Sequence, residues 1–406
     1  MSLVKPFAGL RPVPEQAEAV VAPPYDVLNR EEAKTLVKDK PLSFLHISKA
    51  EIDLADDIDP YDPAVYQKAA DNFAKMCTDG ILTREQKPVY YVYRLTMGTH
   101  VQTGLVATAS VAEYDVNRIR KHEFTRPVKE DDRVRQIDAL NAQTGPVFLV
   151  YRSQTTVDRI LAEVTQGQAL YDLVASGDVR HEIWVMHDET QIQTITEAFD
   201  AMNAIYIADG HHRSAAASRV AALRQQTQAD YFLSVLFPHN QMQILDYNRV
   251  ITSLNGLSAE DFLAKVAQTF DLTKHAAAVK PASINHFGMY LEKQWYELVI
   301  HADLIPSQAD PVGRLDISLL AKHLIEPILD ISDPRRDARI DFVGGIRGMQ
   351  GLEKRVDSGE MVVAFSLYPT RMEDLMSVAD ANEVMPPKST WFEPKLADGL
   401  ISHVLD

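Results

Sequence analysis

The sequence predicts a mixed α/β fold of the α+β type. Short apolar runs that are rich in β-branched and aromatic residues are typical of strands, as in "PVYYVYRLTM" (88–97). They alternate with stretches of helical periodicity, as in "DPAVYQKAADNFAKMCTDGIL" (62–82). No segment of about 20 to 50 residues repeats along the chain, which argues against a solenoid.

The length predicts more than one domain. A chain of 406 residues exceeds an ordinary domain, so we expect two or three compact units. A shift in composition near "NGLS" (255–258) begins a section with more predicted helix. We therefore divide the chain into an α+β region at 1–255 and a C-terminal α+β region at 256–406 that packs against it.

The first region opens with two helices that have clear boundary signals. Asn29 can cap a helix and Glu32 completes a capping box, while Gly80 ends the amphipathic helix that follows Asp62. The pattern then predicts strands at 88–97 and 103–115 joined by a turn at 97–100, a strand at 146–151, a helix at about 155–174, a strand at 181–187, a helix at 189–202, a strand at 204–208 and a helix from 211 to about 224.

The rest of the chain continues the mixture. We expect strands at 230–238 and 241–251, a helix at 258–270, a strand pair around 286–301, a helix at 316–330, and a strand, glycine turn, helix and strand across 340–369. The stretch "MPPKSTWFEPKLADGL" (385–400) has no regular pattern, so it predicts an ordered loop.

Composition argues against several classes of protein. The formal net charge of -16 disfavours binding to DNA or RNA, because phosphate contacts supply most of that affinity. The single cysteine, Cys77, rules out an intrachain disulfide framework, and the opening "MSLVKPFAGLRPVPE" has no apolar signal segment. No apolar run approaches the roughly 20 residues that span a bilayer. We expect a cytoplasmic protein that does not insert into membranes.

The stretch "YIADGHHRSAAASRV" (206–220) places polar residues at a predicted junction of strand and helix. The apolar run 204–208 predicts a strand that stops at Asp209, and alanines after His211 favour a helix. The first amides of a helix lack intrahelical acceptors and the helix dipole adds positive charge, so residues 210–214 would offer donors to an anion. Arg213 adds a guanidinium fork, and Gly210 lets a ligand approach the backbone. A phosphate suits such a site.

Structural roles could explain the same residues. Asp209 could cap the helix, Gly210 could satisfy a positive φ, and Arg213 could form a surface ion pair. A zinc site is disfavoured because adjacent helical residues such as His211 and His212 point about 100° apart. We therefore predict no metal ligands in this motif.

A charge-dense segment supplies further candidates. "RIRKHEFTRPVKEDDRVR" (118–135) holds seven Lys or Arg residues and four Asp or Glu residues. These mixed charges favour a small anionic ligand, or a solvated and salt-bridged loop, over a long nucleic-acid track. Lys121, His122 and Glu123 would face the ligand in the first case and form an exposed, internally paired turn in the second.

Two late segments complete the candidates. The glycine turn "GGIRG" (344–348) would let a ligand approach Arg347, although such turns usually serve backbone geometry. Lys388 and Ser389 lie in the irregular 385–400 stretch, which either carries a site or packs the C-terminus onto the core. We expect residues 120–126 and 388–391 to converge on the cleft that holds Asp209.

Four motifs, taken in order, resemble a known family. They are "VAPPYDV" (21–27), "RKHEFT" (120–125), "ADGHHRSAAA" (208–217) and "MPPKSTWFEPKL" (385–396), and together they are similar to the bacterial and archaeal domain-of-unknown-function family 1015. The ADGHHR box is also similar to that of the ParB and sulfiredoxin-like superfamily, where it binds nucleotide phosphates at a helix start. That superfamily includes free-serine kinases of the SerK type. The resemblance implies a nucleotide- or phosphate-binding core of this kind with additional α+β regions.

The resemblance and the predicted anion site together imply phosphoryl transfer on a small metabolite. Free serine or phosphoserine is the favoured substrate, with Mg²⁺ and a nucleotide, ADP or ATP, as cofactors. The candidate catalytic residues are Asp209, His211, His212 and Glu123. The candidate phosphate ligands are Gly210, Arg213, Ser214 and Lys121, and possible additional site residues are His122, Arg347, Lys388 and Ser389.

Two alternatives use the same motif. A ParB-like nucleotide-binding regulator or partitioning protein would hold the phosphates without metabolic turnover, but its basic DNA-binding surface is disfavoured by the net charge. A metal-dependent hydrolase would use His211 and His212, whose spacing does not favour it.

Overall fold

The structure is a computed structural model that describes residues 2–175, 177–224 and 228–406. It confirms the mixed α/β fold class. The chain forms two compact units: the first holds the residues up to Met242 together with Pro394–Asp406, and the second is Gln243–Glu393. The domain boundary between residues 255 and 256 stays a prediction. Within the described residues, every helix is too short or too polar to cross a membrane.

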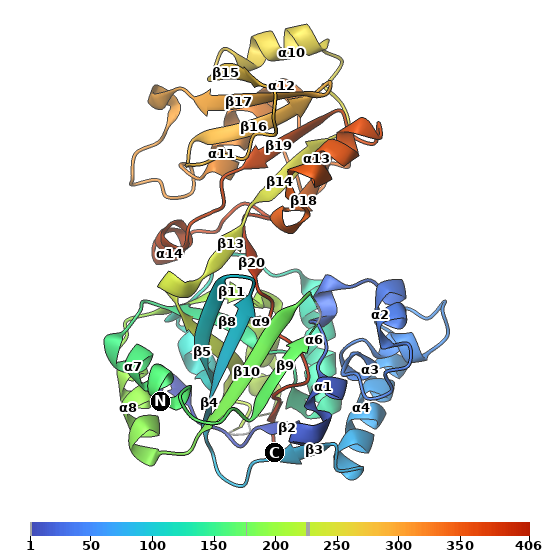
Figure 1. The fold of residues 1–406 in the computed structure, drawn as a ribbon, viewed down its shortest axis with the longest axis vertical. Helices are drawn as coiled ribbons and strands as arrows, with labels where there is room; N and C mark the ends of the chain where they lie inside the picture. The colour runs from blue at the N-terminus through green and yellow to red at the C-terminus, as the bar shows by residue number, and fades with distance from the viewer. Residues whose placement is uncertain (1, 176, 225–227) are drawn as a thin grey trace. The chain divides into compact units, whose positions relative to one another are not determined.

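A large mixed sheet forms the centre of the first unit (Figure 1). Its strand order is β6 (Ile119–Arg120), β11 (Ile205–Asp209), β8 (Val147–Tyr151), β12 (Tyr231–Pro238), β5 (His100–Ser110), β4 (Tyr90–Met97), β10 (Val179–Met186) and β9 (Tyr171–Ala175), with β1 (Val4–Lys5) paired to β5. The β11–β6 and β12–β8 pairs are parallel and the other pairs are antiparallel.

Apolar side chains hold helices against this sheet. Every residue of β8 and β12 is buried, as expected of central strands that are covered on both faces. Helices α7 (Thr155–Val164) and α8 (Glu189–Asp200) contribute Ile160 and Phe199 to the same core, and Figure 1 draws them together at one side of the unit. The remaining elements of this unit are α1 (Ala17–Val20), α2 (Arg30–Val37), α3 (Leu45–Ser48), α4 (Pro63–Thr78), α5 (Val111–Asp115), α6 (Pro127–Leu140), α9 (His211–Arg224), and the paired strands β2 (Leu10–Pro12) with β3 (Leu82–Arg84) and β7 (Ala142–Gln143) with β21 (His403–Val404).

Helix α6 packs on α9 and supports the candidate site. Ile137 of α6 joins Ala216 and Val220 of α9 in one small apolar cluster, which also includes Leu405. Helix α6 begins at Pro127, a residue that is common at the first position of a helix. The 118–135 segment is therefore helical from Pro127 onward. The dense charges conceal the helix in the sequence because few apolar residues mark its buried face.

One predicted helix is partly wrong. The expected helix at 155–174 ends at Val164, and Tyr171–Ala175 instead forms strand β9, which pairs antiparallel with β10. Tyr171 and Leu173 are buried while Asp172 and Val174 are exposed, which is the two-residue period of a strand. Gly167, between the two elements, interrupts the helical stretch.

The second unit has its own antiparallel sheet. The strand order is β15 (Phe270–His275), β17 (Gln294–Ile300), β16 (His286–Leu291), β19 (Val363–Leu367), β14 (Tyr247–Ile251) and β18 (Ile340–Gly344), while β13 (Gln243–Leu245) pairs with β20 (Trp391–Glu393). The helices are α10 (Ala259–Val266), α11 (Asp316–Leu320), α12 (Glu326–Leu329), α13 (Gly348–Asp357) and α14 (Met372–Asp380), and a π-helical turn at Ala321–Ile325 joins α11 to α12. The expected strand pair, and the strand, turn, helix and strand of 340–369, are present.

Candidate functional site

The candidate site lies in the first unit, where β11 ends and α9 begins. Asp209 is the last residue of β11 and α9 starts at His211, as the sequence predicts. Gly210 between them has a φ of +97°. A Cβ atom at this position would lie 3.0 Å from Arg213 Nε. Glycine therefore suits this position for two reasons: it adopts a positive φ without strain, and it leaves room for the arginine side chain.

The helix start offers fewer amides to an anion than the sequence suggests. The N–H groups of Arg213 and Ser214 both donate to the Gly210 carbonyl, over 2.9 and 3.0 Å. By helix geometry, the amides of His211 and His212 are the ones that lack an intrahelical acceptor. Ser214 is fully buried and its hydroxyl donates to the His211 carbonyl over 3.0 Å, so this hydroxyl is used within the helix.

Asp209 forms the centre of a charged group. Its Oδ2 accepts a hydrogen bond from Lys395 Nζ over 3.1 Å, and its Oδ1 lies 3.8 Å from Arg213 Nη2. Burial opposes ionisation of Asp209, but Lys395 and Arg213 outweigh it and hold the pKa of this carboxyl well below its usual range. The carboxylate of Asp209 pairs with these two cations. This ion-pair role takes the place of the helix-capping role that the sequence had offered for Asp209.

Residues 120–126 lie against the first turn of α9. The backbone N–H of His122 points to His211 Nε2 over 3.4 Å, and their rings meet edge to face with centroids 4.5 Å apart. The backbone N–H of Arg126 donates to His212 Nε2 over 3.0 Å. Glu123 Oε2 lies 3.9 Å from His211 Nδ1. Two segments that are far apart in sequence thus meet at the helix start.

The histidines of this site are neutral at pH 7. Burial lowers the pKa of His122 to about 4, and burial together with the neighbouring His122 lowers the pKa of His211 well below its ordinary value. Burial also lowers the pKa of His212, with Arg126 as the next cause. A neutral imidazole donates a hydrogen bond from one ring nitrogen and accepts one at the other, and the accepting nitrogen can also bind a metal.

One group of side chains in the site could hold a metal. Within the described residues, ligand atoms of His122, Glu123 and His211 all lie within 4.8 Å of one another. This set draws its two histidines from separate segments, unlike the His211 and His212 pair considered from the sequence. Two imidazoles and a carboxylate suit zinc or another transition metal better than Mg²⁺.

A pocket lies beside Arg213 within the same unit. Its lining includes Tyr25, Ser48, Arg133, Gln136, Gly145, Arg213 and Asp398. The Arg213 Nη1 group donates to the Pro146 carbonyl. A Cβ atom on Gly145 would lie 3.4 Å from Arg213 Cδ and 3.6 Å from Asp398 Oδ1. The absence of a side chain at Gly145 therefore keeps the space between these two charged groups open.

Asp398 is the most unusual group of this pocket. It is 2% exposed, and among the described residues its Oδ2 has no hydrogen-bond partner. Burial raises its pKa to about 7, although Arg213 acts in the opposite direction. Arg133 is a second cation of this pocket. It pairs with Asp132 over 2.7 Å, and its guanidinium lies 3.9 Å from the ring centre of Tyr25. A buried carboxyl oxygen without a hydrogen-bond partner is costly unless a ligand supplies one.

Comparison with known families identifies the chain. Residues 4–318 match the family described as "Protein of unknown function (DUF1015)". The chain belongs to this family. No curated protein matches it.

Three solved structures with low sequence identity are similar to this DUF1015 chain. A mutant of free serine kinase in complex with AMP has 11% identity and a TM-score of 0.37, with 77% of this chain and 93% of that chain covered. A conserved hypothetical protein from Pyrococcus furiosus has 12% identity and a TM-score of 0.35, with 75% and 96% covered. SbnI with a C-terminal truncation, from Staphylococcus aureus, has 10% identity and a TM-score of 0.40, with 72% and 85% covered.

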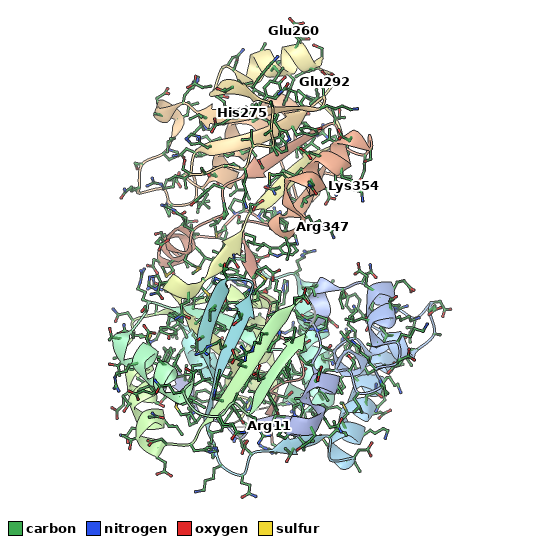
Figure 2. The ribbon with its side chains drawn as sticks, in the orientation of Figure 1. Arg11, Glu260, His275, Glu292, Arg347 and Lys354 are labelled. Atoms are coloured by element: carbon green, nitrogen blue, oxygen red, sulfur yellow. The ribbon has the colours of Figure 1, made fainter. Side chains whose placement is uncertain are left out.

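Four other predicted residues lie away from the β11–α9 contacts described above. Lys121 Nζ lies 3.9 Å from the ring centre of Tyr114, and burial lowers its pKa. Arg347, Lys388 and Ser389 belong to the second unit. Arg347, labelled in Figure 2, is exposed at the turn before α13. The functional roles of all four stay predictions.

The sequence did not single out Lys395, Asp398, Arg133 or Tyr25. Tyr25 and Lys395 lie inside the quoted motifs "VAPPYDV" and "MPPKSTWFEPKL", so motif membership was the available signal for them. Arg133 lies in the charge-dense segment. Asp398 lies in the irregular 385–400 stretch but outside the four family motifs, and its burial arises only when residues 394–406 fold with the rest of the first unit.

Proposed function

We propose that the protein transfers a phosphoryl group to or from a small hydroxyl metabolite, with free serine or phosphoserine as the favoured substrate. The position of Arg213 carries this proposal. Its backbone belongs to the helix start that suits a phosphate, and its side chain lines the pocket that holds Asp398. One guanidinium is therefore close to both the expected phosphate and the expected metabolite.

The charges of the pocket suit a small zwitterion. Arg133 and Arg213 can attract a carboxylate or phosphate group, and Asp398 can accept a hydrogen bond from an ammonium group. The buried Ser48 Oγ, which also has no partner among the described residues, can bond to a hydroxyl or carboxylate. An α-amino acid with a hydroxyl group combines these features.

The reaction then has a simple balance. In the kinase direction the substrate oxygen forms a bond to phosphorus, the bond from phosphorus to the nucleotide oxygen breaks, and the hydroxyl proton passes to a base. Glu123, half exposed beside His211, is our candidate base. Arg213 and the amides of His211 and His212 stabilise charge on the phosphoryl oxygens. Phosphate release from phosphoserine would use the same contacts with water as the nucleophile.

The residues fit Mg²⁺ only in part. Mg²⁺ prefers oxygen ligands and is commonly held by one or two carboxylates together with substrate phosphates. Glu123 can supply one such oxygen. Asp209 is a poor candidate because Lys395 and Arg213 already surround its carboxylate. When bound, the metal would neutralise phosphate charge, while Asp209 keeps the two cations in position.

Ligand binding should raise the melting temperature of the full-length protein. We expect ADP or ATP, and serine or phosphoserine, each to stabilise it in a thermal-shift assay, with larger effects when Mg²⁺ is present. A ligand present at 100 times its Kd adds about 2.7 kcal/mol. A coupled assay should then detect phosphoryl exchange between nucleotide and serine, or phosphate release from phosphoserine.

Other outcomes of this assay select the alternatives. Tight nucleotide binding without turnover on any small hydroxyl compound would favour the ParB-like regulator and end the phosphoryl-transfer proposal. Stabilisation by Zn²⁺ or Mn²⁺ that disappears in His122→Ala would instead favour a metal-dependent hydrolase built on His122, Glu123 and His211.

Asp398→Asn should weaken serine binding about tenfold or more, because the amide oxygen of asparagine no longer carries the negative charge that pairs with the ammonium group. The test is the preference for serine over 3-hydroxypropionate, which lacks that group, measured by isothermal titration calorimetry at pH 8. The wild type should prefer serine, and the variant should bind both equally. Asp138→Asn, at an exposed residue of α6 that pairs with Arg224, is the control and should keep the preference.

Asp398→Asn should also stabilise the folded protein, by an amount that depends on pH. Burial raises the pKa of Asp398 to about 7, so ionisation of this carboxyl costs the folded protein stability as pH rises from about 4 to about 7. Asp398→Asn should therefore raise the melting temperature by several degrees at pH 8 and by less at pH 5. An unchanged serine preference together with an unchanged melting temperature at pH 8 would contradict the role of Asp398.

A further inference from the structure

The second unit contains a pocket that the proposed function does not use. It lies beside β14, and its lining includes Arg249, Arg314, Asp316, Thr370, Arg371 and Ser389. Every one of these residues lies within Gln243–Glu393, so the pocket belongs to this unit alone. Ser389 comes from the "MPPKSTWFEPKL" motif, whose irregular sequence predicted an ordered loop.

A buried arginine ties this loop to the pocket. Arg249 is 3% exposed, and its guanidinium donates to the carbonyls of Tyr247, Lys388 and Pro387. A guanidinium has five N–H donors, so these three bonds leave part of it for another acceptor. Burial lowers the pKa of Arg249 to about 9, which still leaves it charged at pH 7. No carboxylate of the described residues forms an ion pair with it.

A second arginine in the pocket also has no anionic partner in the described part of the chain. Arg314 is partly buried, and no side-chain ion pair or hydrogen bond is found for it within residues 2–175, 177–224 and 228–406. It precedes α11, after a turn in which Asp310 Oδ1 accepts from the Gly313 amide over 2.7 Å. Arg371, by contrast, pairs with Asp374 over 2.6 Å. Among the residues that the structure describes, Arg249 and Arg314 thus have no counter-charge in this pocket.

Asp316 adds a titratable group to the same wall. Its Oδ1 accepts from the Asn285 amide over 2.8 Å, while its buried Oδ2 has no partner among the described residues. Burial raises its pKa to about 7, Asp374 acts in the same direction, and Arg371 and His286 act against it. When protonated, Asp316 can donate a hydrogen bond to an anion, and when ionised it repels one.

We propose that this pocket binds a small anion, either a carboxylate or a phosphate monoester, between Arg249 and Arg314. Guanidinium groups recognise both kinds of anion through paired N–H donors. Asp316 then couples binding to pH, because its neutral form bonds to the anion. The lining residues of this pocket all belong to the second unit, so the pocket provides either an effector site or a second substrate site.

The test measures binding of inorganic phosphate and of acetate to the full-length protein by isothermal titration calorimetry at pH 6 and pH 8. At least one anion should bind more tightly at pH 6, and Arg314→Ala should weaken it about tenfold or more. Arg336→Ala changes an exposed arginine of the same unit outside the pocket, so it should have no effect. Which of the two anions responds identifies the chemistry of the ligand.

Two further variants make the result decisive. Asp316→Asn removes the titration of this carboxyl, so the binding of acetate, which stays ionised from pH 6 to pH 8, should lose its dependence on pH. Phosphate itself titrates in this range, so for phosphate the expected result is tighter binding at pH 8 than in the wild type. Arg213→Ala should remove only the anion binding expected at the α9 site and leave the Arg314-dependent binding unchanged. The proposal is overturned if neither anion binds, if Arg314→Ala behaves like Arg336→Ala, or if only Arg213→Ala abolishes binding, because that last result assigns the anion to the α9 site.

Discussion

Arg213→Ala should lower kcat/KM for phosphoryl transfer by about 100-fold or more. A preorganised cation that meets charge developing on a transferring phosphoryl group has effects on this scale. Arg213 fits this role because its side chain is 11% exposed and packs against Gly210 at the start of α9. The measurement is kcat/KM with serine and nucleotide, and with phosphoserine, for the folded variant.

A matched control lies on the same helix. Arg219 is exposed on α9 and pairs with Glu130 and Asp131, so Arg219→Ala removes an arginine and a surface ion pair without touching the candidate site. Such pairs contribute about 0 to 1 kcal/mol of stability, and we expect activity to stay within about twofold of wild type.

Loss of packing must be separated from loss of charge. Arg213 donates to the Pro146 carbonyl, so the alanine variant is also expected to melt a few degrees lower. Arg213→Lys keeps the positive charge but not the guanidinium fork, and it should recover only part of the activity. Equal activity of Arg213→Ala and Arg219→Ala would exclude Arg213 from the reaction.

Local patterns in the sequence predict the strand and helix of the candidate site well. The apolar run 204–208, the Asp-Gly turn and the alanines after His211 each act over a few residues, and the structure places β11 and α9 accordingly. Helix α6 was harder to predict. Its buried face includes Asp132 and Gln136, so the apolar periodicity that marks a helix is weak.

The partners of the site residues could not be predicted from spacing. Lys395 reaches Asp209 across 186 positions in sequence, and Asp398 enters the same unit through the C-terminal segment. These contacts depend on the return of residues 394–406 to the first unit. No periodicity or local motif in the sequence predicts that residues 394–406 pack in the first unit. We therefore selected Lys388 and Ser389 from the correct motif but not Lys395.

Asp209→Asn should lower kcat by about 100-fold without weakening nucleotide binding. The carboxylate lies between Lys395 and Arg213, and these two cations hold its pKa well below the usual range, so it is ionised at every pH at which the protein would be assayed. The amide of the variant keeps the size of the side chain but removes its charge. Lys395 and Arg213 then lose the negative charge between them, so they should attract phosphate at least as strongly, while their orientation for the reaction is lost.

Comparison with Lys395→Met separates the two effects of Asp209→Asn. The lysine variant removes a cation and should raise the Kd for nucleotide, whereas Asp209→Asn should leave that Kd equal or lower; both are measured by calorimetry and compared with kcat. If Asp209 only capped α9, asparagine would cap it about equally well and the variant would be silent. A variant with wild-type kcat would therefore remove Asp209 from the catalytic residues, even if Arg213 proves essential. The opposite signs expected for the two Kd values are difficult to obtain from general destabilisation, because unfolding would weaken nucleotide binding in both variants.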